Sequence, residues 1–110
     1  SMTKIIRKKR KFIANKKTNL TVTSVGRIKL RKNEHFSINF MDKVNDVCAM
    51  SWGLYATSSI NKRLKKQGCI TYLTQNASKK KFIMIVHKNK KMNFQSYCKR
   101  EKIKVIKIIK

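Results

Sequence analysis

Twenty-nine lysine and arginine residues face only four acidic residues in this 110-residue chain, which leaves a formal net charge of +25. The acids are Glu34, Asp42, Asp46 and Glu101, so at most four of the cations can be neutralised within the chain. Self-repulsion among the remaining cations opposes any compact fold that crowds them together. The fold must therefore place most of its positive charge at the surface, facing water or a polyanion.

The shortage of acids indicates the kind of partner. Lysine outnumbers arginine by 23 to 6, a bias typical of AT-rich genomes. That bias does not explain the shortage, because AT-rich codons also supply aspartate and glutamate. Polynucleotides are the usual partners of folded domains this basic. The composition predicts a nucleic-acid-binding protein, DNA more than RNA, with an accessory or regulatory role in a microbial, plasmid or viral source.

Size and cysteine content set further limits. Hydrophobic residues make up 41% of the chain, enough for a core, and the length is typical of one domain. No apolar run approaches the 18 residues of a membrane span, and no signal-peptide stretch begins the chain. We expect a cytoplasmic or nucleoid-associated protein (nuclear in a eukaryote) that is not secreted. Cys48, Cys69 and Cys98 lack disulfide or zinc spacing, so they are expected to be reduced and mostly buried, with no metal or cofactor.

The first nineteen residues are interpreted as a separate segment. Residues 7–11 form an unbroken run of five cations, which repels itself and favours an extended or disordered state. We expect residues 1–19 to be a flexible basic arm on phosphates and residues 20–110 to be a single α+β nucleic-acid-binding domain. A solvated tail and a weak amphipathic helix on an anionic membrane are the alternatives for the arm.

Two strands and two helices are predicted next. Residues 20–31 alternate with period two and carry a basic outer face, and residues 35–40 form a second strand after a hairpin loop at 32–34. Residues 41–54 follow a helical repeat loosely, and Asp42 and Asp46 suit the start of a helix. A second, basic helix is expected over 59–67, with Ser58 or Ser59 as its N-cap and Gly68 just past its end. One long helix over 41–67 is the alternative.

The rest of the chain reads as a hairpin, a helix and a strand. Residues 69–74 and 81–87 are predicted to pair, residues 91–101 to form a helix, and residues 103–109 to form a strand whose alternation slips at Val105 and Ile106. The order β-β-α-α-β-β-α-β is typical of a winged helix with a second hairpin and a C-terminal helix and strand. The long-helix alternative is a ferredoxin-like fold, which serves RNA or single strands.

The winged-helix interpretation assigns roles to the basic residues. The 59–67 helix would enter the major groove as part of a helix-turn-helix. The loop of the second hairpin, around residues 79–81, would act as the wing, and the arm would follow phosphates. A solvated basic helix face explains the same helix equally well. A homodimer is expected to supply enough contact area. The predicted nucleic-acid-binding residues are Arg7, Lys8, Lys9, Arg10, Lys11, Arg27, Lys29, Arg31, Asn61, Lys62, Arg63, Lys65, Lys66, Lys79, Lys80 and Lys81.

The sequence offers little for catalysis, so we expect no enzyme activity. It has no glycine-rich phosphate loop, and four acids are too few for two-metal nuclease chemistry. One enzyme class remains as an alternative, a small toxin-type ribonuclease that uses His87, Tyr97 and Arg100 in place of metals. A second alternative is an RNA-binding or ribonucleoprotein component. Trp52, the single tryptophan, is expected in the core.

Overall fold

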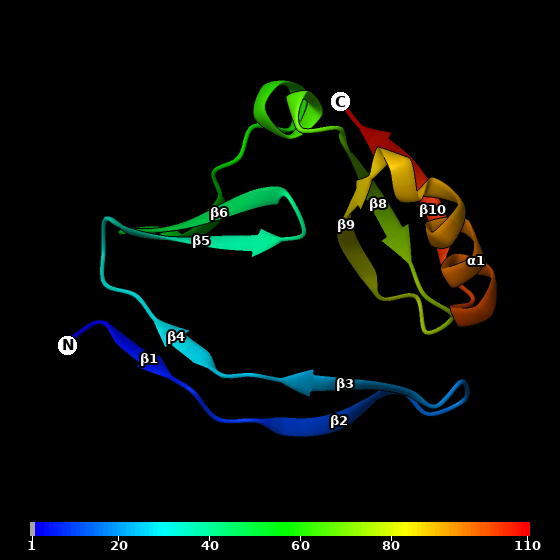
Figure 1. Ribbon diagram of the computed structural model, residues 1–110, viewed down its shortest axis with the longest axis horizontal. Helices are drawn as coiled ribbons and strands as arrows, with labels where there is room; N and C mark the ends of the chain where they lie inside the picture. Colours follow the sequence, from blue (N-terminus) through cyan, green and yellow to red (C-terminus); the bar gives the residue numbers. More distant parts are fainter. Residues whose placement is uncertain (1) are drawn as a thin grey trace. The chain divides into compact units, whose positions relative to one another are not determined.

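The computed structural model describes residues 2–110, which divide into two compact units on either side of the Thr57–Ser58 bond (Figure 1). The first unit contains strands only, and the second combines a small sheet with helices. Within the described residues, no helix is long and apolar enough to cross a membrane.

The first unit begins with a long two-stranded ribbon. Strand β1 (Lys4–Ile6) pairs antiparallel with β4 (Arg27–Lys29), and β2 (Arg10–Asn15) pairs antiparallel with β3 (Leu20–Ser24) (Figure 1). Residues 3–19, where the sequence predicts a flexible arm, thus contribute two paired strands, and their mobility stays a prediction.

Gly26 allows the two parts of the ribbon to meet. Its φ of 154° lies in a region that side chains disfavour. A Cβ atom at this position would stand 2.2 Å from the carbonyl oxygen of Ile6 on the opposite strand. The chain therefore needs glycine here, where the predicted single strand over 20–31 is interrupted between β3 and β4.

The first unit ends with a three-stranded antiparallel sheet in the order β5-β6-β7. Its strands are β5 (Glu34–Phe40), β6 (Lys43–Met50) and β7 (Gly53–Ala56). Phe40 pairs with Lys43, so Met41 and Asp42 form a two-residue hairpin loop, and Met41 adopts the positive φ of 53° that such loops often need. The segment predicted as the 32–34 hairpin loop instead connects β4 to β5, which do not pair with each other.

The predicted helix over residues 41–54, and the long helix over 41–67, are both wrong. Residues 43–50 form the central strand of this sheet, between β5 and β7. Asp42 lies in the hairpin loop, where its carboxylate pairs with Lys43 at 3.2 Å, and Asp46 is buried in β6. Trp52, predicted to be in the core, is 69% exposed and stacks on Tyr55 with ring centroids 5.5 Å apart.

The second unit is built on a three-stranded sheet in the order β10-β8-β9, with β8 antiparallel to both neighbours. A short helical segment, η1 (Ile60–Leu64), precedes β8 (Cys69–Gln75) and β9 (Lys81–His87). A 3-10 turn, η2 (Lys88–Lys90), leads into α1 (Lys91–Glu101), which returns the chain to β10 (Lys104–Ile109). Figure 1 shows α1 lying beside this sheet.

The core of the second unit lies between α1 and the sheet. Tyr72 of β8 stacks on Phe94 of α1 with ring centroids 5.2 Å apart, and Val86 of β9 is buried. Leu64 of η1 is also buried at 2% exposure. Phe94, Tyr97 and Cys98 lie on the less exposed side of α1, as their spacing predicts.

The predicted α+β fold with a helical pair is therefore wrong, and with it both the winged helix and the ferredoxin-like alternative. Each arrangement requires a helix in residues 41–54, where the structure has strands. Residues 2–110 are mostly β, in four small sheets. The hairpin of β8 and β9, helix α1 and strand β10 do occur where the sequence predicts them.

Candidate nucleic-acid interface

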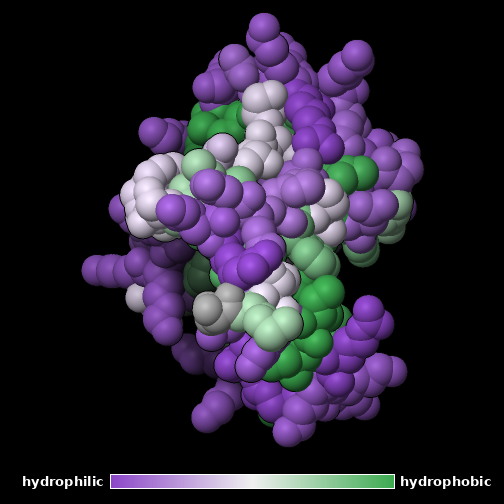
Figure 2. Space-filling model, turned by 90° about the vertical axis from the view of Figure 1, so that its left-hand side faces the viewer, coloured by the Kyte–Doolittle hydropathy of each residue, from purple (hydrophilic) through white to green (hydrophobic). Residues whose placement is uncertain are grey.

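All sixteen residues predicted to bind nucleic acid have exposed side chains. They fall into three groups, which lie on or next to the β1–β4 ribbon with its β2 extension, the η1 segment, and the turn between β8 and β9. Figure 2 shows one face of the molecule, where hydrophilic residues in purple cover most of the surface around smaller hydrophobic patches in green. The structure thus exposes the predicted residues on separate elements within each unit.

The ribbon concentrates cations on one of its faces. Lys4 of β1 stands directly opposite Lys29 of β4, and Ile6 stands opposite Arg27. Alternate residues of a strand share a face, so Lys4, Lys29 and Arg27 project to the same side. Like charges directly opposite each other destabilise a ribbon, and a bound anion would relieve that repulsion. Lys4 was not among the predicted contact residues, although it belongs to the segment predicted as a phosphate-binding arm, because only strand pairing places it beside Lys29.

The run of five cations spans the junction between two strands. Residues 7–9 connect β1 to β2, and Arg10 and Lys11 begin β2. The guanidinium of Arg10 lies over the ring of Phe12, with its central carbon 5.3 Å from the ring centroid. This cation–π contact restrains Arg10, while the connecting residues project from the ribbon without an acidic neighbour in sequence.

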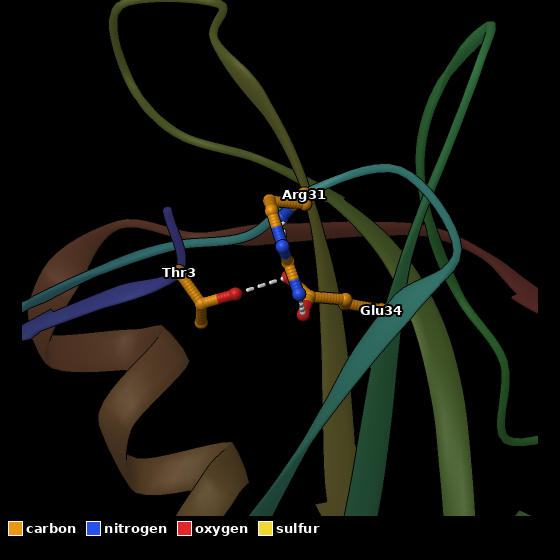
Figure 3. Close-up of polar contacts among 3 residues, drawn as sticks. All are labelled: Thr3, Arg31 and Glu34. Carbon is orange, nitrogen blue, oxygen red and sulfur yellow. Dashed lines mark hydrogen bonds and ion pairs between the residues drawn. The ribbon is translucent and has the colours of Figure 1, made fainter. Parts of the chain in front are cut away.

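Arg31 plays a structural part in the first unit. The Thr3 hydroxyl and the Arg31 backbone amide both donate to Glu34 Oε1, and Arg31 Nη2 lies 3.1 Å from Glu34 Oε2 (Figure 3). The Thr3 hydrogen bond, followed by those from Arg31, lowers the pKa of Glu34 from its ordinary 4.5 to about 2. These contacts tie the start of the ribbon to the start of β5, so Arg31 is already partly neutralised.

The η1 segment begins where the short helix is predicted to begin, but it ends at Leu64, three residues before the predicted end. Ser59 is the N-cap, and its hydroxyl accepts a hydrogen bond from the Arg63 amide at 2.8 Å. Gly68 follows the segment with a positive φ of 78°. Leu64 is buried, whereas Ile60 is 37% exposed. Asn61, Lys62 and Arg63 of η1 are exposed, as are Lys65 and Lys66, which follow it.

The turn between β8 and β9 is held by one asparagine. Asn76 Oδ1 accepts hydrogen bonds from the amides of Ser78 at 3.0 Å and Lys80 at 2.9 Å, and its backbone amide donates to the Lys80 carbonyl at 2.9 Å. Lys79 takes a left-handed conformation with φ of 66°. Because its backbone is fixed in this way, the turn presents Lys79, Lys80 and Lys81 from a defined position.

Two further exposed lysines, Lys104 and Lys107, lie on β10 and were not among the predicted residues. The signal that could have found them is the slip in alternation at Val105 and Ile106. The structure has a shift in register between Val105 and Lys107 at this point.

The residues considered for ribonuclease chemistry lie in two places. The Arg100 guanidinium lies over the Tyr97 ring at 5.5 Å from its centroid, and both residues line a groove between α1 and β9. His87 ends β9 and is not among the residues that line this groove. Cys69 is buried and Cys48 and Cys98 are half-buried, and burial raises the pKa of the Cys98 thiol. Residues 2–110 contain no cluster of three or more histidine, cysteine or acidic side chains that could hold a metal ion.

Comparison of the chain with models of protein families, with characterised proteins and with solved structures found no match.

Proposed function

We propose that this protein is a non-enzymatic nucleic-acid-binding protein that holds the phosphate backbone with exposed lysine and arginine side chains on β-strands and turns. The observation that carries the proposal is the excess of twenty-five cations together with the exposure of all sixteen predicted contact residues. A phosphate backbone supplies the regularly repeated negative charge that such a surface lacks.

The acids of the protein do little to reduce this excess. Glu34 pairs with Arg31, Asp42 with Lys43, and Glu101 with Arg100, while Asp46 is buried in β6. Most of the exposed lysines are thus left to water and to partners. The ribbon adds a specific cost, because Lys4 and Lys29 face each other across paired strands.

The proposed ligand is the phosphate backbone of a polynucleotide, which DNA and RNA have in common. The expectation of duplex DNA depended on a recognition helix supported by a helix at 41–54, and the structure has strands at that position. Lysine meets phosphate as a point charge and reads little sequence, and lysines make up most of the exposed cations. We therefore propose binding with weak sequence preference, as an accessory protein would use it, and pairing of two copies stays a prediction.

A competition experiment tests this proposal. Fluorescence anisotropy with a labelled 20-mer duplex DNA, challenged with single-stranded DNA and with a hairpin RNA, measures which polynucleotide the full chain prefers. We expect all three to compete, with affinities that differ less between sequences of one type than between types. Failure of every polynucleotide to bind at low salt would overturn the proposal. RNA cleavage in the presence of EDTA would replace it with the ribonuclease alternative.

A further inference from the structure

The shift in register within β10 changes which side of the sheet its lysines occupy. Residues three apart in a regular strand point to opposite faces. Lys104 pairs with Gln75 and Lys107 pairs with Leu73, and these two partners are two residues apart on β8. The extra residue, Ile106, therefore places Lys104 and Lys107 on the same face.

A third lysine joins them from the other edge of the sheet. Lys81 of β9 pairs with Gln75, so Lys81, Gln75 and Lys104 form one row across the three strands. This face is the one opposite α1, because Tyr72, the β8 residue that stacks on Phe94, alternates with Leu73. The three lysines are exposed, as are Lys79 and Lys80 in the adjoining turn.

The spacing of the cluster keeps its charges coupled. Strands lie about 4.8 Å apart and residues two positions apart lie about 6.8 Å apart, so Lys81 and Lys104 are separated by about 10 Å and Lys104 and Lys107 by about 7 Å at their Cα atoms. These separations do not exceed the Debye length of about 10 Å at 0.1 M salt. Gln75 stands between Lys81 and Lys104 in this row, and its side-chain amide is a hydrogen-bond donor.

No acid of the second unit is available to neutralise these lysines. Residues 58–110 contain sixteen lysines and arginines and a single acid, Glu101. Glu101 is 5% exposed, and its Oε2 accepts a hydrogen bond from Arg100 Nε at 3.2 Å. A register that brings like charges onto one face without an acid costs stability in the free protein, and a ligand with several negative charges would repay that cost.

We propose that Lys81, Gln75, Lys104 and Lys107, with the turn lysines Lys79 and Lys80, form a site for consecutive phosphates of a polynucleotide strand. This inference rests on the proposed function and assigns it a place. The lysines occupy the row of Lys81 and Lys104, the next row on the same face, which holds Lys107, and the adjoining turn. This spread suits a chain of phosphates more than a single small anion. Its contacts are charges and one amide, so it holds the backbone without reading bases.

The test compares two triple variants of the full chain. K81Q/K104Q/K107Q removes the site, and K88Q/K91Q/K99Q removes the same charge from exposed positions on η2 and α1. Affinity for a 20-mer duplex, a single strand and a hairpin RNA is measured by anisotropy from 50 to 200 mM salt, with inorganic polyphosphate as a further competitor. Circular dichroism checks that each variant folds, and K81R/K104R/K107R restores the charge.

The salt dependence gives the expected result. Each lost phosphate contact lowers the slope of log affinity against log salt by about 0.7 to 0.9. We expect the site variant to lose about 2 units of slope and at least about tenfold in affinity at 50 mM salt, the control variant to change by less than half as much, and the arginine variant to keep the wild-type slope. Equal losses in the two glutamine variants would overturn the site and leave the proposed function standing. Binding of polyphosphate but of no polynucleotide would overturn both.

Discussion

Replacing Gly26 with alanine is expected to disrupt the β1–β4 part of the ribbon. The new Cβ atom would lie 2.2 Å from the Ile6 carbonyl oxygen, whereas real Cβ contacts below 3.0 Å are essentially never seen. The Ile6 oxygen belongs to the backbone and cannot rotate away as a side chain could, so β1 must separate from β4. The register between these strands contains three residue pairs, Lys4 with Lys29, Ile5 with Ile28 and Ile6 with Arg27.

Gly53 provides a matched control within the same unit. It has a similar φ of 148°, but a Cβ atom there would meet nothing within 4 Å. Both alanine variants therefore bear a conformational strain of about 1 to 3 kcal/mol, and only G26A also breaks strand pairing. Losing two or three backbone hydrogen bonds, at about 1 kcal/mol each, adds about 2 to 3 kcal/mol.

Urea unfolding and native-state hydrogen exchange measure the difference. G26A should lower the free energy of unfolding by about 2 kcal/mol more than G53A does, or, if the ribbon opens separately, accelerate exchange in β1 and β4 alone. G26A should also weaken polynucleotide binding, since Lys4, Arg27 and Lys29 would no longer share a face. Equal unfolding energies and equal exchange in the two variants would refute the ribbon packing described here.

Two other predictions concern the residues that fix the basic surface. In N76A the backbone amides of Ser78 and Lys80 lose their hydrogen-bond acceptor, so their hydrogen exchange should become faster. Polynucleotide affinity should fall several-fold, as a loss of about 1 kcal/mol implies. Unchanged exchange of both amides would argue against a turn held by Asn76. The lowered pKa of Glu34 stabilises the fold above its unfolded value of about 4.5, and this contribution is lost as pH falls toward about 2. Thermal unfolding of wild type and E34Q should therefore differ at pH 6 and converge near pH 2, and a constant difference across that range would contradict the pKa.

The second unit could be read from the sequence in large part. Ser59 caps the start of η1 through its side chain, and Gly68 takes a positive φ in the turn just before β8. The hairpin of β8 and β9 follows from two apolar runs separated by a polar loop, and the slip at Val105 and Ile106 coincides with the shifted register of β10. Local signals sufficed here because each element is short and bounded by residues with strong conformational preferences.

The first unit could not be read in the same way. Strand β6 lies between β5 and β7, and seven of its eight residues are half-buried. Because the residues that point to either face of the sheet are similarly covered, its hydrophobic pattern shows no period of two. Its Met41–Asp42 hairpin lacks the glycine or asparagine that usually marks such loops. Asp42 and Asp46 are four residues apart, a spacing that is also typical of the acidic first turn of a helix. In the structure Asp42 lies in a loop and Asp46 is buried in a strand.

The sequence predicted which kinds of residue form the candidate site, but it did not predict which of them lie together. Exposure of the cations follows from charge alone, because four acids cannot neutralise twenty-nine bases. Which cations share a face depends on strand pairing, as in the opposition of Lys4 and Lys29 and in the convergence of Lys104 and Lys107. Such pairings join residues far apart in the sequence, and no local pattern specifies their register.

The most direct test of the central claim is the salt dependence of wild-type binding. If the exposed lysines hold a phosphate backbone, plots of log affinity against log salt should be linear with a slope near −5, corresponding to about six phosphates, and affinity should fall about a thousandfold between 50 and 200 mM salt. An affinity that stays constant over this range, or no binding to any polynucleotide at 50 mM salt, would contradict the account.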